Sequence, residues 1–397
     1  MTPARKTALI LAFSQAVIGS APSISFSLGG LAGHYMLDAD KSLATAPVTG
    51  FTVGVAIGAL PAAWIMRRLG RRGGFMSGAM ITGLGGALAT YALFIQNFWL
   101  FAAALAFMGF GGSFVQQYRF AAADNAPSHE KARAISMVLA GGVFAAIIGP
   151  QTVIWTKELL APIQFAGPFA AIVGLALIGG IALSFLGPET HEETGRVAGA
   201  APARPLREIV MQKRFVVGLS CGVGSYALMS FVMTGAPLAM VGCGFSTDEA
   251  TLGISWHVMA MFAPSFFTGS VIARFGKERV IAFGLALLIA CALVALSGIA
   301  LWQFWLALIL LGIGWNFAFI GATAIITECY TNEEKNAVQG FHDFVLFSVV
   351  AFASLMSGAV YNAYGWEALN VVIFPVTLFC MGLLGYLVVT DKSRRTA

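Results

Sequence analysis

Long apolar runs, separated by short charged or turn-rich breaks, fill nearly all of the 397 residues. Only 10% of the residues are charged and 58% are hydrophobic, whereas a soluble domain carries about 25% charged residues. Each run is about as long as the roughly 20 residues with which a helix crosses a bilayer, and none shows the alternation of membrane strands. The sequence therefore predicts an all-α integral membrane protein with 12 transmembrane helices. The runs fall at about 7–33, 43–66, 73–95, 98–122, 134–157, 163–186, 215–240, 249–272, 278–300, 302–327, 337–360 and 367–390.

Several short motifs in the first half of the chain recur in the second half, 204 to 206 residues later. The pairs are Arg68-Leu69-Gly70-Arg71 with Arg274-Phe275-Gly276-Lys277, Gly19-Ser20 with Gly224-Ser225, and Asp124, Glu130 and Lys131 with Glu328, Glu334 and Lys335. We therefore expect two parallel six-helix repeats, the arrangement of one class of transporters. The predicted units are an N-terminal bundle at 1–190, a linker at 191–214 and a C-terminal bundle at 215–397. The linker is rich in Gly, Pro, Ala and charge, which is typical of a flexible segment.

The basic residues gather on one side of the predicted membrane. With both termini placed in the cytoplasm, twenty of the 23 lysines and arginines lie on that side, only Lys41 and Lys157 lie opposite, and Arg119 lies within a span. Such asymmetry follows from positive-inside insertion. The net charge of +5 thus reflects the orientation of the chain in the membrane. A nucleic-acid partner is excluded, because binding to nucleic acid needs basic residues clustered on one face. The apolar run after Arg5 and Lys6 is longer than the hydrophobic region of a signal peptide. We therefore expect that this run is not cleaved off and forms the first span.

Sequence patterns for enzymes and metal sites are lacking. The five cysteines show no C-x-x-C spacing, and the five histidines show no H-E-x-x-H spacing. No G-x-x-x-x-G-K-[ST] loop for ATP is present. We therefore expect neither cofactor nor metal and no enzymatic activity, and we expect ion or solute gradients to supply any energy for transport.

Loop motifs then point to a family. Ala63 to Arg72 reads AWIMRRLGRR, which is similar to the G-x-x-x-D-R-x-G-R-R signature of the major facilitator superfamily of secondary transporters, although Ala63 and Arg67 replace its first glycine and its acid. Gly269 to Lys277, the loop from Asp124 to Ala134, and Gly149-Pro150 resemble further family motifs. The chain thus resembles this superfamily over essentially its whole length. The resemblance implies alternating access of a small-molecule substrate between two bundles, and we expect a monomer in a lipid bilayer.

Two segments narrow the resemblance. Asp40 to Phe51 (DKSLATAPVTGF) and Gln116 to Asp124 (QQYRFAAAD) resemble a bacterial subgroup linked to riboflavin uptake. That likeness implies uptake of a ring-bearing solute such as riboflavin across a bacterial-type cytoplasmic (inner) membrane. Two alternatives stay open, a proton-coupled multidrug exporter and a non-transporting membrane sensor on the same fold. The exporter is disfavoured because Gly149-Pro150 lacks the glycine pair that follows in exporters.

Polar residues within spans are candidates for substrate binding, because a polar side chain in contact with lipid is unfavourable in free energy unless it lines a wetted cavity. Aromatic and amide side chains together suit a planar or ring-bearing solute. Each candidate has an alternative interpretation as packing or an interhelical hydrogen bond, which contributes about 0.6 kcal/mol on average. The candidate substrate-binding residues are Gln15, Gln116, Arg119, Gln151, Trp155, Tyr226, Trp256, His257 and Asn316.

Charged residues suggest a gate. Arg119 and Asp343 lie at similar depth in opposite halves, and we expect them to pair across the cytoplasmic side when the cavity opens outward. The alternative is that Arg119 pairs with Asp124 or extends to the interface. His342 and Asp343 are candidates for coupling to protons, or else a structural pair at a helix start.

Arg67 is the last gating candidate. An arginine at the family's acidic position would be repelled by the N-terminus of span eleven. We therefore expect it to pair with Glu333 or Glu334 in the facing loop. The alternative is a solvated charge that only sets topology.

Overall fold

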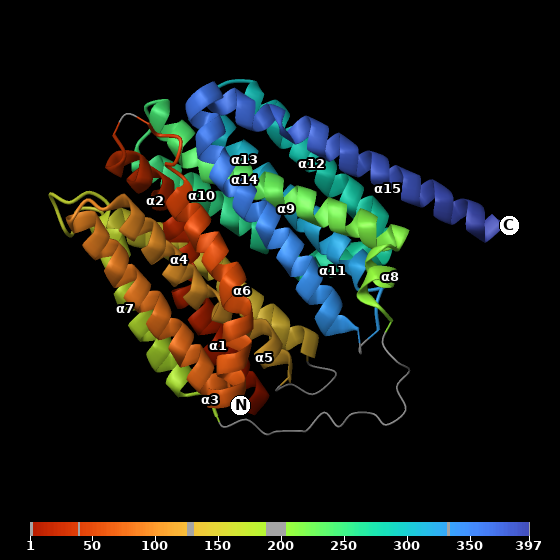
Figure 1. The fold of residues 1–397 in the computed structure, drawn as a ribbon, viewed down its shortest axis with the longest axis horizontal. Helices are drawn as coiled ribbons and strands as arrows, with labels where there is room; N and C mark the ends of the chain where they lie inside the picture. Colours follow the sequence, from red (N-terminus) through yellow and green to blue (C-terminus); the bar gives the residue numbers. More distant parts are fainter. Residues whose placement is uncertain (1–2, 39, 125–130, 188–203, 332–333, 397) are drawn as a thin grey trace.

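The computed structural model describes residues 3–38, 40–124, 131–187, 204–331 and 334–396, and every regular element among them is helical (Figure 1). The elements are α1 (Pro3–Val17), η1 (Ile18–Ser20), α2 (Ala21–Met36), α3 (Ala46–Phe94), α4 (Phe98–Val115), α5 (Tyr118–Asp124), α6 (Lys131–Thr156), α7 (Ala166–Ser184), α8 (Leu206–Val210), α9 (Lys213–Gly242), α10 (Thr247–Phe262), α11 (Ser265–Phe275), α12 (Lys277–Leu296), α13 (Leu301–Ile326), α14 (Lys335–Val371) and α15 (Ile373–Thr396).

These helices have the length and apolarity of membrane spans. Ten helical stretches of the described chain are long and apolar enough to cross a bilayer, and α10 with α11, bent by 43°, makes an eleventh. The stretch Val338–Thr390 covers 53 residues and breaks at Gly365, whose φ is 78°. Each part on either side of that break exceeds the roughly 20 residues of a span, so its length allows each part to cross the bilayer once. The predicted all-helical membrane fold is confirmed.

A left-handed glycine repeats between the halves. Gly70 has φ 71° and ψ 168°, and Gly276, 206 residues later, has φ 85° and ψ 155°. Residues with a side chain rarely adopt this conformation, so both loops need glycine to turn the chain sharply into the next span. The duplicated sequence motif therefore makes the same turn twice.

The helices form two groups that meet at one end and diverge toward the other (Figure 1). Elements α1 to α7 make up one bundle and α9 to α15 the other. The bundles touch through the pairs α6–α10, α3–α14, α2–α9 and α2–α10. Leu238 of α9 is 5% exposed and packs within the core of the first bundle, and Phe26 of α2 contacts the cores of both.

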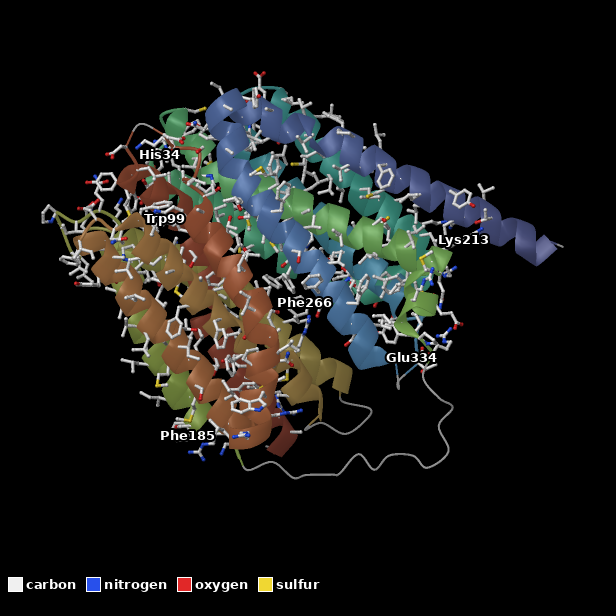
Figure 2. The ribbon with its side chains drawn as sticks, in the orientation of Figure 1. His34, Trp99, Phe185, Lys213, Phe266 and Glu334 are labelled. Atoms are coloured by element: carbon white, nitrogen blue, oxygen red, sulfur yellow. The ribbon has the colours of Figure 1, made fainter. Side chains whose placement is uncertain are left out.

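Large apolar side chains cover the outside. Trp99 and Phe185 point away from the bundles (Figure 2) and are 66% and 63% exposed. In water such a surface would be unfavourable by about 25 cal/mol per Å², but it matches the hydrocarbon of a bilayer. The exposed apolar surface is thus the lipid-facing surface of a membrane protein.

The end of the predicted linker is docked on the second bundle. Arg204 Nε and Nη2 donate to the Glu334 carboxylate at 2.7 and 2.8 Å, and the Arg204 backbone N–H adds a third bond at 3.0 Å. Ile209 of α8 is buried against Phe215 and Ile326. The segment 204–214, expected to be flexible, therefore packs as a short helix with an anchored start. The Arg204 guanidinium lowers the pKa of Glu334 to about 2.

Arg204→Ala is expected to lower the midpoint of thermal unfolding at pH 7, because the nearly buried Glu334 carboxylate loses its bidentate partner. A carboxylate whose pKa is lower in the folded than in the unfolded protein stabilises the fold at any pH above the pKa of the unfolded state. This stabilisation is lost as the pH falls toward and through the pKa of the folded state. The difference between wild type and variant should therefore be full at neutral pH, and shrink below pH 4.5 toward pH 2. Thermal unfolding of the purified protein across pH measures it.

Arg207→Ala is the matched control, since Arg207 lies exposed on α8. An equal loss in both variants would contradict a specific anchor at Arg204.

Candidate substrate site between the two bundles

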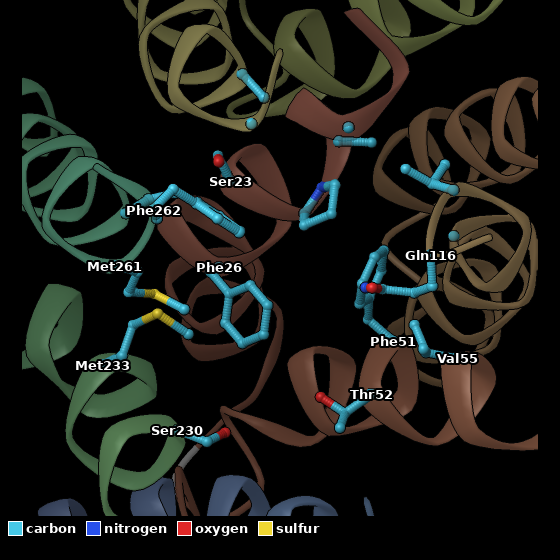
Figure 3. Close-up of a pocket in the computed structure, with 18 of the residues that line it drawn as sticks. Ser23, Phe26, Phe51, Thr52, Val55, Gln116, Ser230, Met233, Met261 and Phe262 are labelled. Carbon is cyan, nitrogen blue, oxygen red and sulfur yellow. The ribbon is translucent and has the colours of Figure 1, made fainter. Parts of the chain in front are cut away.

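A cavity of about 160 Å³ lies between the two bundles (Figure 3). Side chains from both bundles form its walls, which are mostly aromatic, aliphatic and thioether groups with a few amides and hydroxyls. The lining residues are Gln15, Ile18, Gly19, Ala21, Pro22, Ser23, Phe26, Phe51, Thr52, Val55, Thr82, Met108, Gly112, Val115, Gln116, Gly142, Ala145, Tyr226, Met229, Ser230, Met233, Val258, Met261, Phe262, Phe347 and Val350.

Three spans are interrupted beside this cavity. Span one passes from α1 through the 3-10 turn η1 into α2, and Pro22 stands in the first turn of α2. Span four breaks at Gln116 and Gln117 between α4 and α5. Span eight bends between α10 and α11 at Pro264, directly after Phe262. Pro lacks an N–H and cannot continue a helical ladder, so the sequence itself places two of the three breaks.

The break in span eight is braced by Asn316 of α13. The Asn316 side-chain N–H groups donate to the Met261 carbonyl and to Ser265 Oγ, both at 2.7 Å. Its Oδ1 accepts from Thr268 Oγ1 at 2.6 Å. Asn316 is fully buried, and all three bonds reach across the bend. Its observed contacts thus hold the bent span rather than face the cavity.

Several polar groups on the cavity wall have no hydrogen-bond partner among the residues that the structure describes. No hydrogen bond joins the side chains of Gln15, Ser23 or Gln116 to another described residue, and the buried Ser230 hydroxyl is likewise unpaired. Hydroxyls elsewhere in the spans usually bond to their own helix, as Thr90 does to the Gly86 carbonyl at 2.9 Å. Amides and hydroxyls left open in a cavity are available to a ligand.

Tyr226 extends this wall toward the gate candidates. Its ring contacts Trp315 and Phe319 edge to face at 5.2 Å, which fixes its orientation. Arg119, exposed on α5, lies within electrostatic range of Asp343 and near Tyr226. His342 Nδ1 lies 2.9 Å from Asp343 Oδ1. The structure therefore places Arg119 of one bundle within electrostatic range of Asp343 of the other.

The cavity brings together three of the predicted binding residues, Gln15, Gln116 and Tyr226. The others do not line it. His257 is buried, with its Nδ1 2.8 Å from the Leu308 carbonyl oxygen, and Trp155 is 79% exposed on the outer surface. Gln151, Trp256, Asn316 and Arg119 also lie outside the lining set. The role of each of these residues in substrate binding stays a prediction.

Two gating candidates fall outside the described side chains. The side chains of Arg67 and Asp124 are not described, nor is any part of Glu333. Glu334, the other partner expected for Arg67, is occupied by Arg204. The roles of Arg67 and Asp124 therefore stay predictions.

Sequence reasoning missed most of the apolar wall. Phe26, Phe51 and Phe262 face the cavity together with Met233 and Met261 (Figure 3). Helical spacing from a predicted residue could have found some of them. Tyr226, Met229, Ser230 and Met233 follow the i, i+3, i+4, i+7 pattern of one helix face.

The bundles are locked at the face where they converge. Thr45, fully buried before α3, donates through Oγ1 to the Ser354 carbonyl at 3.0 Å and accepts from the Gly358 N–H at 3.1 Å. These two groups of α14 are an i, i+4 pair, so the threonine hydroxyl inserts into the helical ladder. Lys157 and Asp248 add an ion pair between the bundles at 2.5 Å.

Comparison with known proteins decides the family. The major facilitator superfamily model matches residues 7–264 and 219–397, and thus nearly the whole chain. The chain belongs to the major facilitator superfamily. It is 48% identical over 376 residues to the riboflavin transporter RfnT of Brucella anthropi, covering 94% of each chain. It is 30% and 28% identical to the MFS-type transporters YddS and YdeG of Bacillus subtilis, covering 94% and 95% of this chain and 91% and 92% of theirs.

As a member of this superfamily, the chain is a multi-pass membrane transporter and not an enzyme, as the sequence predicted. Transporters of this class bind substrate near the bilayer midplane between their repeats. The cavity between the bundles has that position in the fold. Its convergent polar groups and apolar walls make it the candidate substrate site.

Thr45→Val is expected to weaken the lock between the bundles, because the hydrogen bonds that tie Thr45 to the Ser354 carbonyl and the Gly358 N–H of α14 are lost. One hydrogen bond contributes about 0.5 to 1.5 kcal/mol net, so the midpoint of thermal unfolding should fall. Thr90→Val is the matched control, since Thr90 Oγ1 bonds only to the Gly86 carbonyl of its own helix. An unchanged midpoint in Thr45→Val would contradict the lock.

Proposed function

We propose that this chain transports riboflavin, with uptake as its direction, by alternating access of the cavity between the two bundles. The supporting observation is the 48% identity to the riboflavin transporter RfnT over 94% of both chains, combined with a cavity of suitable chemistry. We further propose that it works as a monomer in a bacterial-type inner membrane with both termini in the cytoplasm. The positive-inside pattern supports that orientation.

The walls of the cavity suit a flavin ring. Riboflavin carries a flat three-ring system with apolar faces, and aromatic and thioether side chains pack well against such faces. Phe26 and Phe51 stand edge to face with their ring centroids 6.2 Å apart, and Met233 and Met261 approach from the other bundle (Figure 3). A flat ring between these groups would contact both bundles at once.

The unpaired amides suit the polar edge of the same ring. One edge of the flavin presents an imide N–H between two carbonyl oxygens. A glutamine amide offers two N–H donors and one carbonyl acceptor, which complements that edge. The Gln116 amide points into the cavity (Figure 3), and we propose that it binds the imide edge with Gln15 nearby.

The size of the cavity bears on the transport cycle. Sites for drug-sized ligands occupy about 300 to 1,000 Å³, and this cavity measures about 160 Å³. A whole flavin therefore needs the bundles to part further than they do here. Binding is then coupled to the separation of the bundles, as alternating access requires.

We propose that Arg119 and Asp343 pair to close the cytoplasmic side when the cavity opens outward. The two groups lie within electrostatic range of each other although the bundles diverge at this end of the structure, so closing that end would bring them together. His342, adjacent to Asp343 at 2.9 Å, is proposed to share a proton with it and to couple transport to a proton gradient.

Gln116→Leu is expected to reduce the apparent affinity for riboflavin about tenfold, because a leucine of similar size offers no hydrogen bond to the imide edge. Uptake of labelled riboflavin by proteoliposomes with the purified protein measures it. Gln117→Leu is the control, since this adjacent glutamine does not line the cavity. Wild-type proteoliposomes that accumulate no riboflavin under any gradient would contradict the proposed function itself.

Charge reversal tests the gate. Arg119→Asp and Asp343→Arg are each expected to lower riboflavin transport roughly tenfold or more, and the double variant to recover part of that loss, because the pair is rebuilt in the opposite sense. A double variant no better than either single one contradicts the pairing. In Asp343→Asn the response of transport to an imposed pH gradient should disappear; an unchanged response removes proton coupling.

A further inference from the structure

Ser230 is the one residue of the cavity wall whose hydroxyl is both buried and without a partner among the described residues. It lies on α9, is 1% exposed, and its Oγ meets no donor or acceptor. Leaving a buried polar group unpaired costs about 1 to 3 kcal/mol. An ordinary structural role therefore does not explain why a serine occupies this position.

Neighbouring hydroxyls show what a structural serine does in this fold. Serine in a helix commonly bonds back to the carbonyl four residues earlier, as Ser25 does to Ala21 at 2.8 Å. Ser225, one turn before Ser230 on α9, bonds to the Gly222 carbonyl at 3.0 Å. Ser357 of α14 ties to the Phe231 carbonyl at 2.6 Å. Within the described part of the chain, Ser230 makes neither a hydrogen bond to its own helix nor one to a neighbouring helix.

The walls around this hydroxyl are mostly apolar. Met229 and Met233 flank Ser230 on α9, and Phe347 and Val350 line the cavity from α14. Figure 3 shows Ser230 on the second bundle with its oxygen directed toward the cavity, while Gln116 enters from the first bundle. The cavity thus has polar groups on different walls, with the Ser230 hydroxyl on the second bundle and the Gln116 amide and the Ser23 and Thr52 hydroxyls on the first.

We propose that Ser230 determines specificity by hydrogen-bonding the polyhydroxylated chain of the flavin, while the amide of Gln116 binds the imide edge of its ring. A serine hydroxyl both donates and accepts, as an alcohol group on the ligand does, so either can supply the proton. This inference rests on the proposed riboflavin transport. A site that pairs a ligand hydroxyl discriminates strongly against an analogue that lacks it.

Lumiflavin tests this directly, because it keeps the three-ring system and replaces the ribityl chain by a methyl group. Binding of riboflavin and lumiflavin to the purified full-length protein is measured by quenching of flavin fluorescence. Ser230→Ala is expected to weaken riboflavin binding about 3- to 10-fold, which is the effect of one hydrogen bond, and to leave lumiflavin binding within about twofold. Ser225→Ala should change neither, because Ser225 is fully buried outside the cavity lining.

Retained lumiflavin binding in Ser230→Ala shows that the variant is folded and its ring site intact. Equal losses for both ligands, or no loss for riboflavin, would overturn the role of Ser230 and leave the proposed function standing. A wild-type protein that binds neither flavin would overturn the proposed function, and this inference with it.

Discussion

The hydrogen-bonding requirement of the backbone in lipid governs this structure. In hydrocarbon every N–H and C=O group must be satisfied within the protein, so irregular backbone is tolerated only where it is buried or lines a cavity. Spans one, four and eight each depart from regular helix, and all three departures lie beside the cavity between the bundles. Of the polar groups left open on the cavity wall, Ser23 and Gln116 lie at or next to these breaks, whereas Gln15 and Ser230 lie within regular helix.

The contacts between the bundles also combine a small number of hydrogen bonds with apolar packing. Thr45 uses one hydroxyl to satisfy both a carbonyl and an N–H of α14, and Ser255 of α10 donates to the Ala146 carbonyl of α6 at 2.6 Å. Few directional bonds hold the bundles together, and apolar contacts around Phe26 and Leu238 supply the rest. A junction of this kind separates without leaving many buried groups unpaired, which alternating access requires.

Much of the fold could be predicted from the sequence, because lipid leaves a chain with 10% charged residues few alternatives. The run lengths predicted the spans and the duplicated motif predicted a repeat, whereas the left-handed turns at Gly70 and Gly276 are seen only in the structure. The docked segment near Ile209 was missed because its composition is that of a linker, and only Glu334, distant in the sequence, shows why it is ordered. For the site, Gln15, Gln116 and Tyr226 were found as polar groups in spans.

Ser230 was missed because sequence does not show whether a hydroxyl bonds to its own helix. Trp155, in turn, looked like a cavity residue because it follows Gln151 by one turn. The structure turns its side chain outward, since a helix facing lipid on one side exposes large aromatic groups there.

The brace at Asn316 has a consequence for how the transporter flexes. Its three hydrogen bonds join α13 to both sides of the bend in span eight, one to Met261 of α10 and two to Ser265 and Thr268 of α11. A motion that changes the angle of span eight must therefore break these bonds or carry α13 with it. At the break in span one, the described hydroxyls of Ser20 and Ser25 bond to carbonyls of their own span, and this break borders the cavity at Pro22.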